Sequence, residues 1–406
     1  MNSAALRRLQ QGANESRRLR RLERGGVPEA QTCLCLLINS LPMDYVGRQL
    51  RLIEELRASR FDALLIAHLP NIRYLCGFSG SSGALLVTLG GSTLFTDGRY
   101  TQQAKAEVKA AGIKIVRTGP LTSAMEWLGR RTSSNRGRGI TLGIEGQYLT
   151  VSARRALAEV QAKGIRMREA PALVERMRMV KDAGEIELIR SAVTLGAGLF
   201  DRALQVIRPG VREVEVAAEM EYSARKAGAD GMSFETIVAA GARSALPHGR
   251  ASEAAIAAGG FVVCDFGVIL HGYCSDRTRT VYVGAATGEA RRVYEAVLSS
   301  QQAAIAAVRP GIEVRRVDMA ARKSLQKSDL AQYFSHSTGH GVGLEIHEAP
   351  RVARGQQEIL RPGMVITIEP GVYLPGQWGV RIEDMVVVTE QDCEVLSPKQ
   401  KEFIVI

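Results

Sequence analysis

The chain has 406 residues and a formal net charge of +11, and its composition is 46% hydrophobic and 23% charged. This balance is typical of an ordinary globular protein, and the length predicts two domains that can each bury a core. No apolar run approaches the roughly 20 residues that a helix needs to cross a bilayer, so we expect no membrane partner.

Residues 1–42 are predicted to form a poorly ordered basic leader. The segment contains seven arginines against three glutamates, so it holds a good part of the positive charge. Its apolar run, CLCLLINSL, is short, contains an asparagine and lacks an A-x-A cleavage pattern, which argues against a signal peptide. Met43 is the alternative start of the chain. Because much of the excess charge belongs to this leader, we expect no nucleic-acid partner.

The cysteines indicate a reducing compartment, and we therefore expect a cytoplasmic protein. They form no CxxC pair and no disulfide-like framework. By strand alternation Cys264 points away from the face that carries Asp265, so it is interpreted as a core residue. The six cysteines are Cys33, Cys35, Cys76, Cys264, Cys274 and Cys393.

From residue 43 to 166 the sequence alternates between helix and strand patterns, which predicts a small α/β domain. The predicted elements are, in chain order, a helix at 45–59, a strand at 62–68, a hairpin at 83–97 with Gly90–Gly91 as its turn, a helix at 99–111, a strand at 113–116 and a helix at 150–163.

A linker at 167–180 is predicted to lead into a second domain at 181–406, which contains an internal repeat. The turns Arg208-Pro209-Gly210 and Arg309-Pro310-Gly311 are 101 residues apart, each between two helix patterns and followed by a carboxylate-bearing hairpin. Two copies are too few to stack as a repeat array. We therefore expect two halves that face each other about a pseudo-twofold axis.

The first of these hairpins, at 261–284, carries Asp265 and Asp276. Residues equidistant from a hairpin turn face each other across the strands, with Cβ atoms about 5 Å apart. The two aspartates are equidistant from the Leu270–His271 step, so they are predicted to be cross-strand neighbours.

The second hairpin, at 363–388, carries Glu369 and Glu383, which are centred on Gly376. One such pair of carboxylates could be a solvated strand face. Two pairs inside apolar strands are harder to explain in that way, because an unpaired buried charge is costly. Together the four carboxylates predict a metal cluster.

The segment 336–350, HSTGHGVGLEIHEAP, is predicted to supply the nitrogen ligand, and its glycines allow close backbone approach around His340. Four carboxylates and one imidazole suit two divalent ions of the manganese, cobalt or zinc kind, because hard oxygen donors dominate. Two-metal sites hold their ions about 3.5–4 Å apart and generate a hydroxide nucleophile near neutral pH. The predicted chemistry is hydrolysis.

These motifs resemble, in order and spacing, the metal-dependent Xaa-Pro peptidases, aminopeptidase P and prolidase, of the pita-bread fold. The likeness covers roughly residue 44 to the C-terminus and includes NIRYLCGFSGSSGALLV in the first domain. It implies an α/β (α+β) protein in which a small creatinase-like domain precedes a catalytic domain of two duplicated halves around antiparallel sheet. It also implies a proline-containing peptide substrate, manganese as the leading metal, and a homodimer or larger oligomer.

The same resemblance assigns roles to individual residues. The implied metal ligands are Asp265, Asp276, His340, Glu369 and Glu383. The implied catalytic residues are His248, His336, His347, Glu369 and Arg381. The three histidines would contact the substrate or the tetrahedral intermediate. Glu369 would act as a proton shuttle, and Arg381 would orient Glu383.

Substrate choice is less sharply indicated than reaction type. The HEAP…RPGMV…EPGVY wording favours an aminopeptidase P, with an Xaa-Pro dipeptidase as the alternative, and Arg351 or Arg354 could meet a dipeptide carboxylate. A non-catalytic RNA- or protein-binding member of the fold is a third possibility. Because such a member would be expected to have lost metal ligands, and all five are intact here, the sequence favours an enzyme.

Overall fold

The structure is a computed structural model and describes residues 43–117, 119–132 and 139–406. The predicted leader, together with Cys33 and Cys35, lies outside the described residues. Among the described cysteines none forms a disulfide, and Cys76, Cys264 and Cys274 are buried. None of the described helices has the length and apolar character required to cross a membrane.

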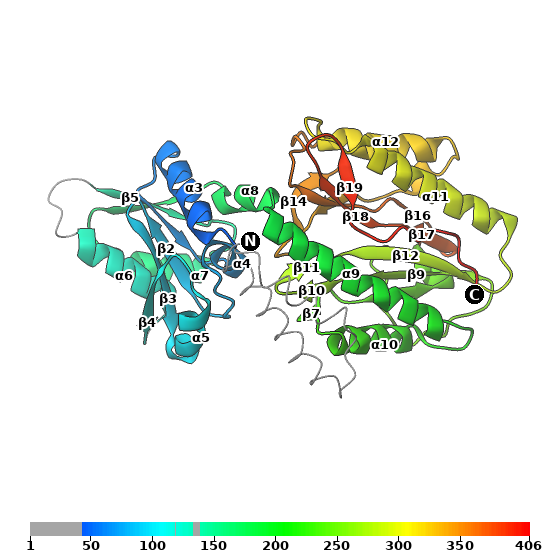
Figure 1. Ribbon diagram of the computed structural model, residues 1–406, viewed down its shortest axis with the longest axis horizontal. Helices are drawn as coiled ribbons and strands as arrows, with labels where there is room; N and C mark the ends of the chain where they lie inside the picture. Colours follow the sequence, from blue (N-terminus) through cyan, green and yellow to red (C-terminus); the bar gives the residue numbers. More distant parts are fainter. Residues whose placement is uncertain (1–42, 118, 133–138) are drawn as a thin grey trace, which may run out of the picture. The chain divides into compact units, whose positions relative to one another are not determined.

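The first domain is a six-stranded mixed sheet with the strand order β4-β3-β2-β1-β5-β6. Its strands are β1 (Ala63–Ile66), β2 (Ala84–Thr88), β3 (Gly91–Asp97), β4 (Gly112–Val116), β5 (Ile140–Ile144) and β6 (Ile165–Glu169). Its helices are α3 (Tyr45–Ala58), α4 (Leu69–Cys76), α5 (Thr101–Glu107), α6 (Pro120–Thr132) and α7 (Val151–Glu159). Figure 1 shows these helices around the sheet. Side chains on alternate positions of β1 enter two separate cores, one for each face of the sheet.

The predicted elements of this domain are confirmed in type, but several differ in extent. The predicted helix at 99–111 is wrong at both ends, because Gly98–Tyr100 is a 3-10 turn and Val108 is already extended with ψ 125. The predicted helix at 150–163 stops at Glu159. In the hairpin Thr88 pairs with Gly91, so the two-residue turn is Leu89–Gly90, one residue earlier than predicted.

The predicted linker contains regular structure. It holds the end of β6 and helix α8 (Leu173–Met179), and α9 (Ala183–Val206) begins directly afterwards. Asp182 caps α9 by accepting a hydrogen bond from the backbone N–H of Glu185, whose carboxylate accepts one from the N–H of Asp182.

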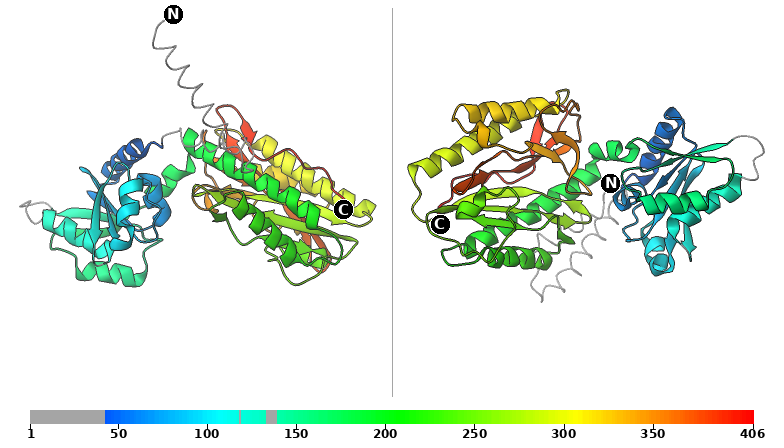
Figure 2. Two further views of the ribbon diagram at one scale, coloured as in Figure 1. Left: turned by 60° about the horizontal axis from the view of Figure 1, so that its bottom comes forward. Right: turned by 180° about the vertical axis from the view of Figure 1, so that it is seen from behind.

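The predicted duplication is visible in the helices that follow. The first half contains α9 and α10 (Glu213–Lys226), and the second contains α11 (Gly288–Ala307) and α12 (Val314–Gln326). Figures 1 and 2 show α9 and α10 on one face of the central strands and α11 and α12 on the other. Each helix pair packs on its own apolar core.

Both Pro-Gly turns of the repeat make the same backbone contacts. The N–H of Gly210 donates to the carbonyl of Ile256, and the N–H of Gly311 donates to the carbonyl of Leu360. Both glycines have positive φ, 90° and 85°, which explains the residue type. The two Pro-Gly turns are therefore equivalent in backbone as well as in sequence.

The central strands form several small sheets. The first half contributes β12-β9-β8 and β11-β10-β7, and the second contributes β14-β13-β15-β18-β19 and the pair β16-β17. The bounds are β7 (Gly231–Met232), β8 (Ile237–Ala240), β9 (Gly260–Phe266), β10 (Val268–Leu270), β11 (Tyr273–Cys274), β12 (Arg277–Val283), β13 (Gly339–Gly341), β14 (Glu348–Val352), β15 (Val365–Ile368), β16 (Gly371–Leu374), β17 (Trp378–Arg381), β18 (Asp384–Val388) and β19 (Cys393–Val395).

The predicted register of the first hairpin is wrong. Asp265 pairs with Thr278, so Asp276 lies diagonally across from it rather than opposite. The turn is centred one residue later, at His271–Gly272, where both residues have positive φ, 49° and 82°. Two successive left-handed residues form the tight turn that matches the twist of a hairpin.

The predicted register of the second hairpin is confirmed. Ile368 pairs with Asp384 in one strand pair and Gly371 with Arg381 in the next, so both pairs are centred on Gly376. Glu369 and Glu383 therefore occupy equivalent positions at the break between the two strand pairs.

Candidate metal centre

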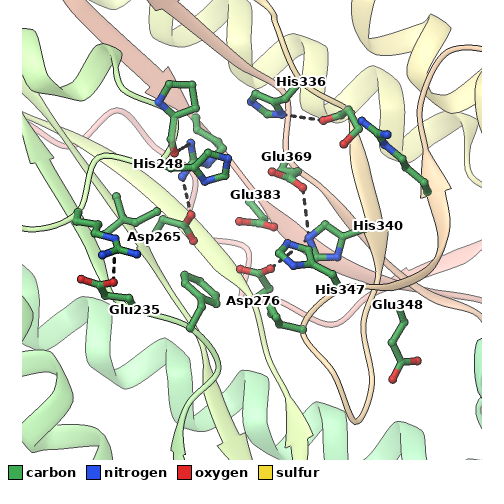
Figure 3. Close-up of a pocket in the computed structure, with 18 residues that line it drawn as sticks. Glu235, His248, Asp265, Asp276, His336, His340, His347, Glu348, Glu369 and Glu383 are labelled. Atoms are coloured by element: carbon green, nitrogen blue, oxygen red, sulfur yellow. Dashed lines mark hydrogen bonds and ion pairs between the residues drawn. The ribbon is translucent and has the colours of Figure 1, made fainter. Parts of the chain in front are cut away.

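The central strands enclose a cavity of about 770 Å³. Every residue to which the sequence assigned a metal or catalytic role lines it. Figure 3 shows the four predicted carboxylate ligands and His340 around one space, with His248, His336 and His347 at its edge. The first hairpin, the segment after α12 and the second hairpin thus meet at one place.

His340 lies closest to two of the carboxylates. Its Nε2 is 3.6 Å from Oδ2 of Asp276 and 3.5 Å from Oε1 of Glu369. Asp276, His340 and Glu383 each offer a ligand atom, and the three atoms lie within 4.8 Å of one another. The Nδ1 of His340 is 3.0 Å from the carbonyl of Gly341. With Nδ1–H donating to this carbonyl, the lone pair of Nε2 faces the carboxylates, as a metal ligand requires.

The backbone around His340 is packed closely. A Cβ at Gly339 would lie 1.9 Å from the carbonyl oxygen of Thr367, and one at Gly341 would lie 2.2 Å from that of Ala349. Glycine is therefore required at both positions, in agreement with the close approach predicted from the sequence.

Burial in this cavity raises the pKa of several carboxyl groups. Desolvation and the neighbouring carboxylates, Glu383 first, hold the pKa of Asp276 well above its usual range. Desolvation and the nearby Glu369 do the same for Glu383, and desolvation raises the pKa of Glu369 to about 7. Desolvation also lowers the pKa of His340 to about 4. The acidic groups therefore repel one another, and His340 resists a positive charge of its own.

This donor set fits divalent cations. Oδ1 of Asp265 and Oε1 of Glu383 are buried and accept no hydrogen bond from any described residue. Cations bound between the carboxylates would satisfy both atoms and remove the repulsion. The donors are carboxylate oxygens and one imidazole nitrogen, which suits hard or borderline divalent ions.

Arg381 holds a different ligand from the one predicted. Its Nη2 donates to Oδ2 of Asp265 at 2.6 Å, whereas the sequence predicted that it orients Glu383. Its effect on Glu383 is indirect, because its Nε donates to Thr278 Oγ1, and that hydroxyl donates to Oε2 of Glu383. The difference arises because β17 lies beside β12, where the Arg381 N–H donates to Thr280 Oγ1 at 3.2 Å.

The three pocket histidines other than His340 fall into two groups. Nδ1 of His336 lies 2.8 Å from the carbonyl of Ser337, and its Nε2 lies 2.9 Å from the hydroxyl of Tyr373. Both nitrogens of His336 are therefore engaged within the protein. His248 and His347 are exposed, and neither makes a hydrogen bond to a described residue. The His347 ring lies edge-on to His340, with centroids 4.4 Å apart.

Sequence reasoning missed two groups that support the site. Tyr373 connects His336 to Arg381, because the Tyr373 hydroxyl also accepts a hydrogen bond from Nη1 of Arg381 at 2.7 Å. Thr367 Oγ1 accepts a hydrogen bond from the N–H of His340 and donates to Glu369 at 3.3 Å. Thr367 is two residues before Glu369 on the same strand face, a spacing that could have indicated it. No spacing relates Tyr373 to His336.

The two arginines considered for a substrate carboxylate lie in different cavities. Arg351, on β14, is exposed and lines the cavity that holds the predicted ligands. Arg354 lines a separate groove beside α12. Of the two, only Arg351 is placed to meet a substrate.

Comparison with known proteins agrees with this geometry. Residues 187–390 match metallopeptidase family M24, and residues 48–180 match the creatinase/prolidase N-terminal domain. An Xaa-Pro dipeptidase of Pyrococcus horikoshii is 35% identical over 366 residues, which cover 89% of this chain and 100% of the relative.

Solved structures give the same result. The Xaa-Pro dipeptidase from Bacillus anthracis has a TM-score of 0.84 at 36% identity, over 89% of this chain and 100% of the other. The X-Pro aminopeptidase from Thermotoga maritima has a TM-score of 0.78, also at 36% identity, over 86% and 100%. With the site geometry, these matches show that the chain belongs to metallopeptidase family M24 and is a metal-dependent peptidase with the pita-bread fold.

Proposed function

We propose that the protein is an Xaa-Pro dipeptidase that uses two divalent ions, with manganese as the leading candidate. The observation that carries this proposal is the position of Arg351 in the same cavity as the candidate metal ligands. Arg250 and Arg381 also line the cavity, but they pair with Glu235 at 2.9 Å and with Asp265 at 2.6 Å. Arg351 forms no ion pair with a described residue, so its guanidinium is available for the C-terminal carboxylate of a dipeptide.

The relatives support the dipeptidase over the aminopeptidase that the sequence motifs favoured. The Pyrococcus horikoshii and Pyrococcus furiosus relatives are both Xaa-Pro dipeptidases, at 35% and 36% identity. Identity to the solved structures does not separate the two activities, because a dipeptidase and an aminopeptidase are both 36% identical to this chain. The aminopeptidase remains the alternative.

In the proposed reaction, two divalent ions, when bound, would supply a hydroxide nucleophile near neutral pH. Asp265, Asp276, His340, Glu369 and Glu383 would hold the ions. The scissile carbonyl would lie between His248 and His347, whose unengaged ring nitrogens can donate to the developing oxyanion. The apolar side chains of Phe234, Ile237 and Ile346 also line the cavity and can contact the proline ring.

Glu369 is proposed as the proton carrier. Without bound cations, burial raises its pKa to about 7, which shows that this buried carboxyl group can hold a proton. It would take the proton that the attacking water loses and deliver it to the departing nitrogen, which is a secondary amine when proline follows the cleaved bond. His336, with both nitrogens engaged, is proposed to position Tyr373 and Arg381.

The test is a comparison of three peptides after reconstitution with manganese, cobalt or zinc. We expect Ala-Pro to be cleaved fastest and a chelator to abolish cleavage. Faster cleavage of Ala-Pro-Ala would favour the aminopeptidase, and cleavage of Ala-Ala-Ala alone would refute the specificity for proline.

The predicted homodimer or larger oligomer is tested by light scattering, and the predicted cytoplasmic location by fractionation of cells.

A further inference from the structure

A second cavity lies outside the candidate metal centre, in a groove of about 650 Å³ beside α12. It is lined by five basic side chains against one acidic side chain, Asp318. The basic residues are Arg315, Arg316, Arg322, Lys323 and Arg354. Such a concentration of positive charge in a concave surface attracts anions.

The lining follows from the sequence of α12. Arg315, Arg316, Arg322 and Lys323 recur at the spacing that places residues on one face of a helix. The opposite face, which includes Val314, Val317 and Leu325, is buried in the core. The helix therefore presents its cations together on the solvent side.

Three of these cations form no close ion pair within the described part of the chain. Arg315 pairs with Glu313 at 2.6 Å, and Arg322 pairs with Asp318. Arg316, Lys323 and Arg354 are exposed and form no ion pair with any residue that the structure describes. These three can therefore bind an external anion without breaking an existing contact.

The duplicated half shows that the fold alone does not produce this charge. A groove of about 390 Å³ lies beside α10, the counterpart of α12. At the repeat spacing, Glu215 and Glu221 stand where α12 has Arg316 and Arg322, and Glu221 lines that groove. The groove beside α10 is lined by one acidic residue, Glu221, and one basic residue, Arg225, so it lacks the excess of positive charge found beside α12.

The floor of the basic groove is connected to the candidate metal centre. Arg322 donates to Asp318 and also to the carbonyl of His336, at 2.6 Å. The hydroxyl of Thr338 donates to Asp318 at 2.8 Å, and the carbonyl of Thr338 accepts a hydrogen bond from the N–H of Glu369. An anion in the groove would therefore lie against the pair that holds the segment leading to His340.

We propose that this groove binds a small anion with two phosphoryl groups. Lys323 follows Arg316 by seven positions, which places the two residues about 10 Å apart along the helix axis. Two anionic groups on one small molecule can each pair with one of these cations, whereas a single phosphate would require both long side chains to converge on it. The concave shape favours a small molecule over an extended nucleic acid.

The test is isothermal titration of the metal-loaded full-length protein with fructose 1,6-bisphosphate, which carries two phosphoryl groups. The triple variant Arg316→Gln, Lys323→Gln, Arg354→Gln is compared with Arg208→Gln, Arg292→Gln, Lys399→Gln, which removes three exposed positive charges elsewhere. We expect the first variant to bind at least tenfold more weakly and the second to stay within twofold of the wild type. Binding at the metal centre would persist in both variants, so equal affinity in all three proteins would overturn the proposal.

Two further measurements extend the test. Inorganic phosphate should bind at least tenfold more weakly than the bisphosphate, and equal binding would refute the two-group ligand. Amide hydrogen exchange of residues 334–340 should slow when the bisphosphate is added to the wild type and not when it is added to the first triple variant. A single-stranded RNA oligonucleotide that binds the groove more tightly than the bisphosphate would overturn the small-ligand assignment. None of these readouts depends on peptidase activity.

Discussion

Nη2 of Arg178, in the helix between the two domains, lies 2.5 Å from Oε1 of Glu348, in the strand that follows His347. The same nitrogen donates to Glu345 at 2.8 Å, and Nη1 donates to Asn71 in the first domain. Arg178 and Glu348 are 3% and 6% exposed in their side chains. One buried guanidinium thus fixes both ends of the 345–348 segment, which contains His347.

Replacement of this guanidinium should be costly. We expect Arg178→Met to reduce the free energy of unfolding by about 3–5 kcal/mol, because it leaves the buried carboxylate of Glu348 without its main partner. Lys181 lies 3.2 Å from Glu348 and still compensates part of the charge of that carboxylate. We therefore expect a loss near the lower end of that range. Urea denaturation measures the change. The control is Arg190→Met, which breaks an exposed ion pair: Arg190 lies 2.7 Å from Glu394, a similar distance. This variant should lose less than about 1 kcal/mol of the free energy of unfolding. Similar losses in both variants would contradict the role of burial.

Two neighbouring arginines of β12 should respond in opposite directions. Arg277 is buried, and its three side-chain nitrogens make no hydrogen bond to any described residue. Burial lowers its pKa to about 10. Arg277→Met should therefore increase the free energy of unfolding by about 1–3 kcal/mol, because it removes an unsatisfied buried charge.

Arg279 provides the contrast. It is 2% exposed in its side chain and pairs with the fully buried Asp384 at 2.8 Å. Arg279→Met should reduce the free energy of unfolding by about 3–5 kcal/mol. Thermal and urea denaturation of the two variants give the comparison. Loss of stability in both would mean that Arg277 has a partner that its contacts do not reveal.

Arg351 should act on substrate binding rather than on the chemical step. We expect Arg351→Gln to raise KM for Ala-Pro by about 10- to 100-fold, the loss of a charge-assisted bond worth about 1.5–3 kcal/mol. KM for a dipeptide amide, which has no terminal carboxylate, should change little. Arg361→Gln, an exposed arginine that lies outside the cavity, is the matched control. An equal rise in KM for the dipeptide and its amide would refute carboxylate recognition.

His336 should make stability depend on pH. Burial, assisted by the positive charge of Arg381, lowers its pKa to about 4. The unfolded chain takes up this proton near pH 6.5 and the folded protein does not, so the free energy of unfolding falls as pH falls from about 6.5 to 4. At about 1.4 kcal/mol per pH unit, the histidine contributes about 3 kcal/mol to that fall.

We therefore expect His336→Gln to remove about 3 kcal/mol of pH dependence between pH 6.5 and 4. Urea denaturation of the metal-free protein measures it without interference from metal release. His271→Asn, at the exposed tip of the first hairpin, should leave the dependence unchanged. A steep fall that persists in His336→Gln would assign the dependence to other groups.

The choice of His340 as the nitrogen ligand came from the resemblance to the Xaa-Pro peptidases. The sequence by itself indicated the four candidate carboxylate ligands, the duplicated halves and the register of the second hairpin. These features are local or periodic: carboxylates in apolar strands, a repeated Pro-Gly turn, and a glycine at the centre of a symmetric pattern. The register of the first hairpin was missed because its turn requires His271 in a left-handed conformation, φ 49°, which its residue type does not indicate.

Only the tertiary structure decided which charged groups pair. Arg381 binds Asp265, 116 residues away, and Arg178 binds Glu348, 170 residues away. At such separations many arginine–carboxylate pairs are compatible with the sequence, and the choice depends on which strands and helices the folded core places side by side. The basic groove beside α12 was hidden for the same reason, because Arg354 joins the helix only after the chain has passed through β13 and β14.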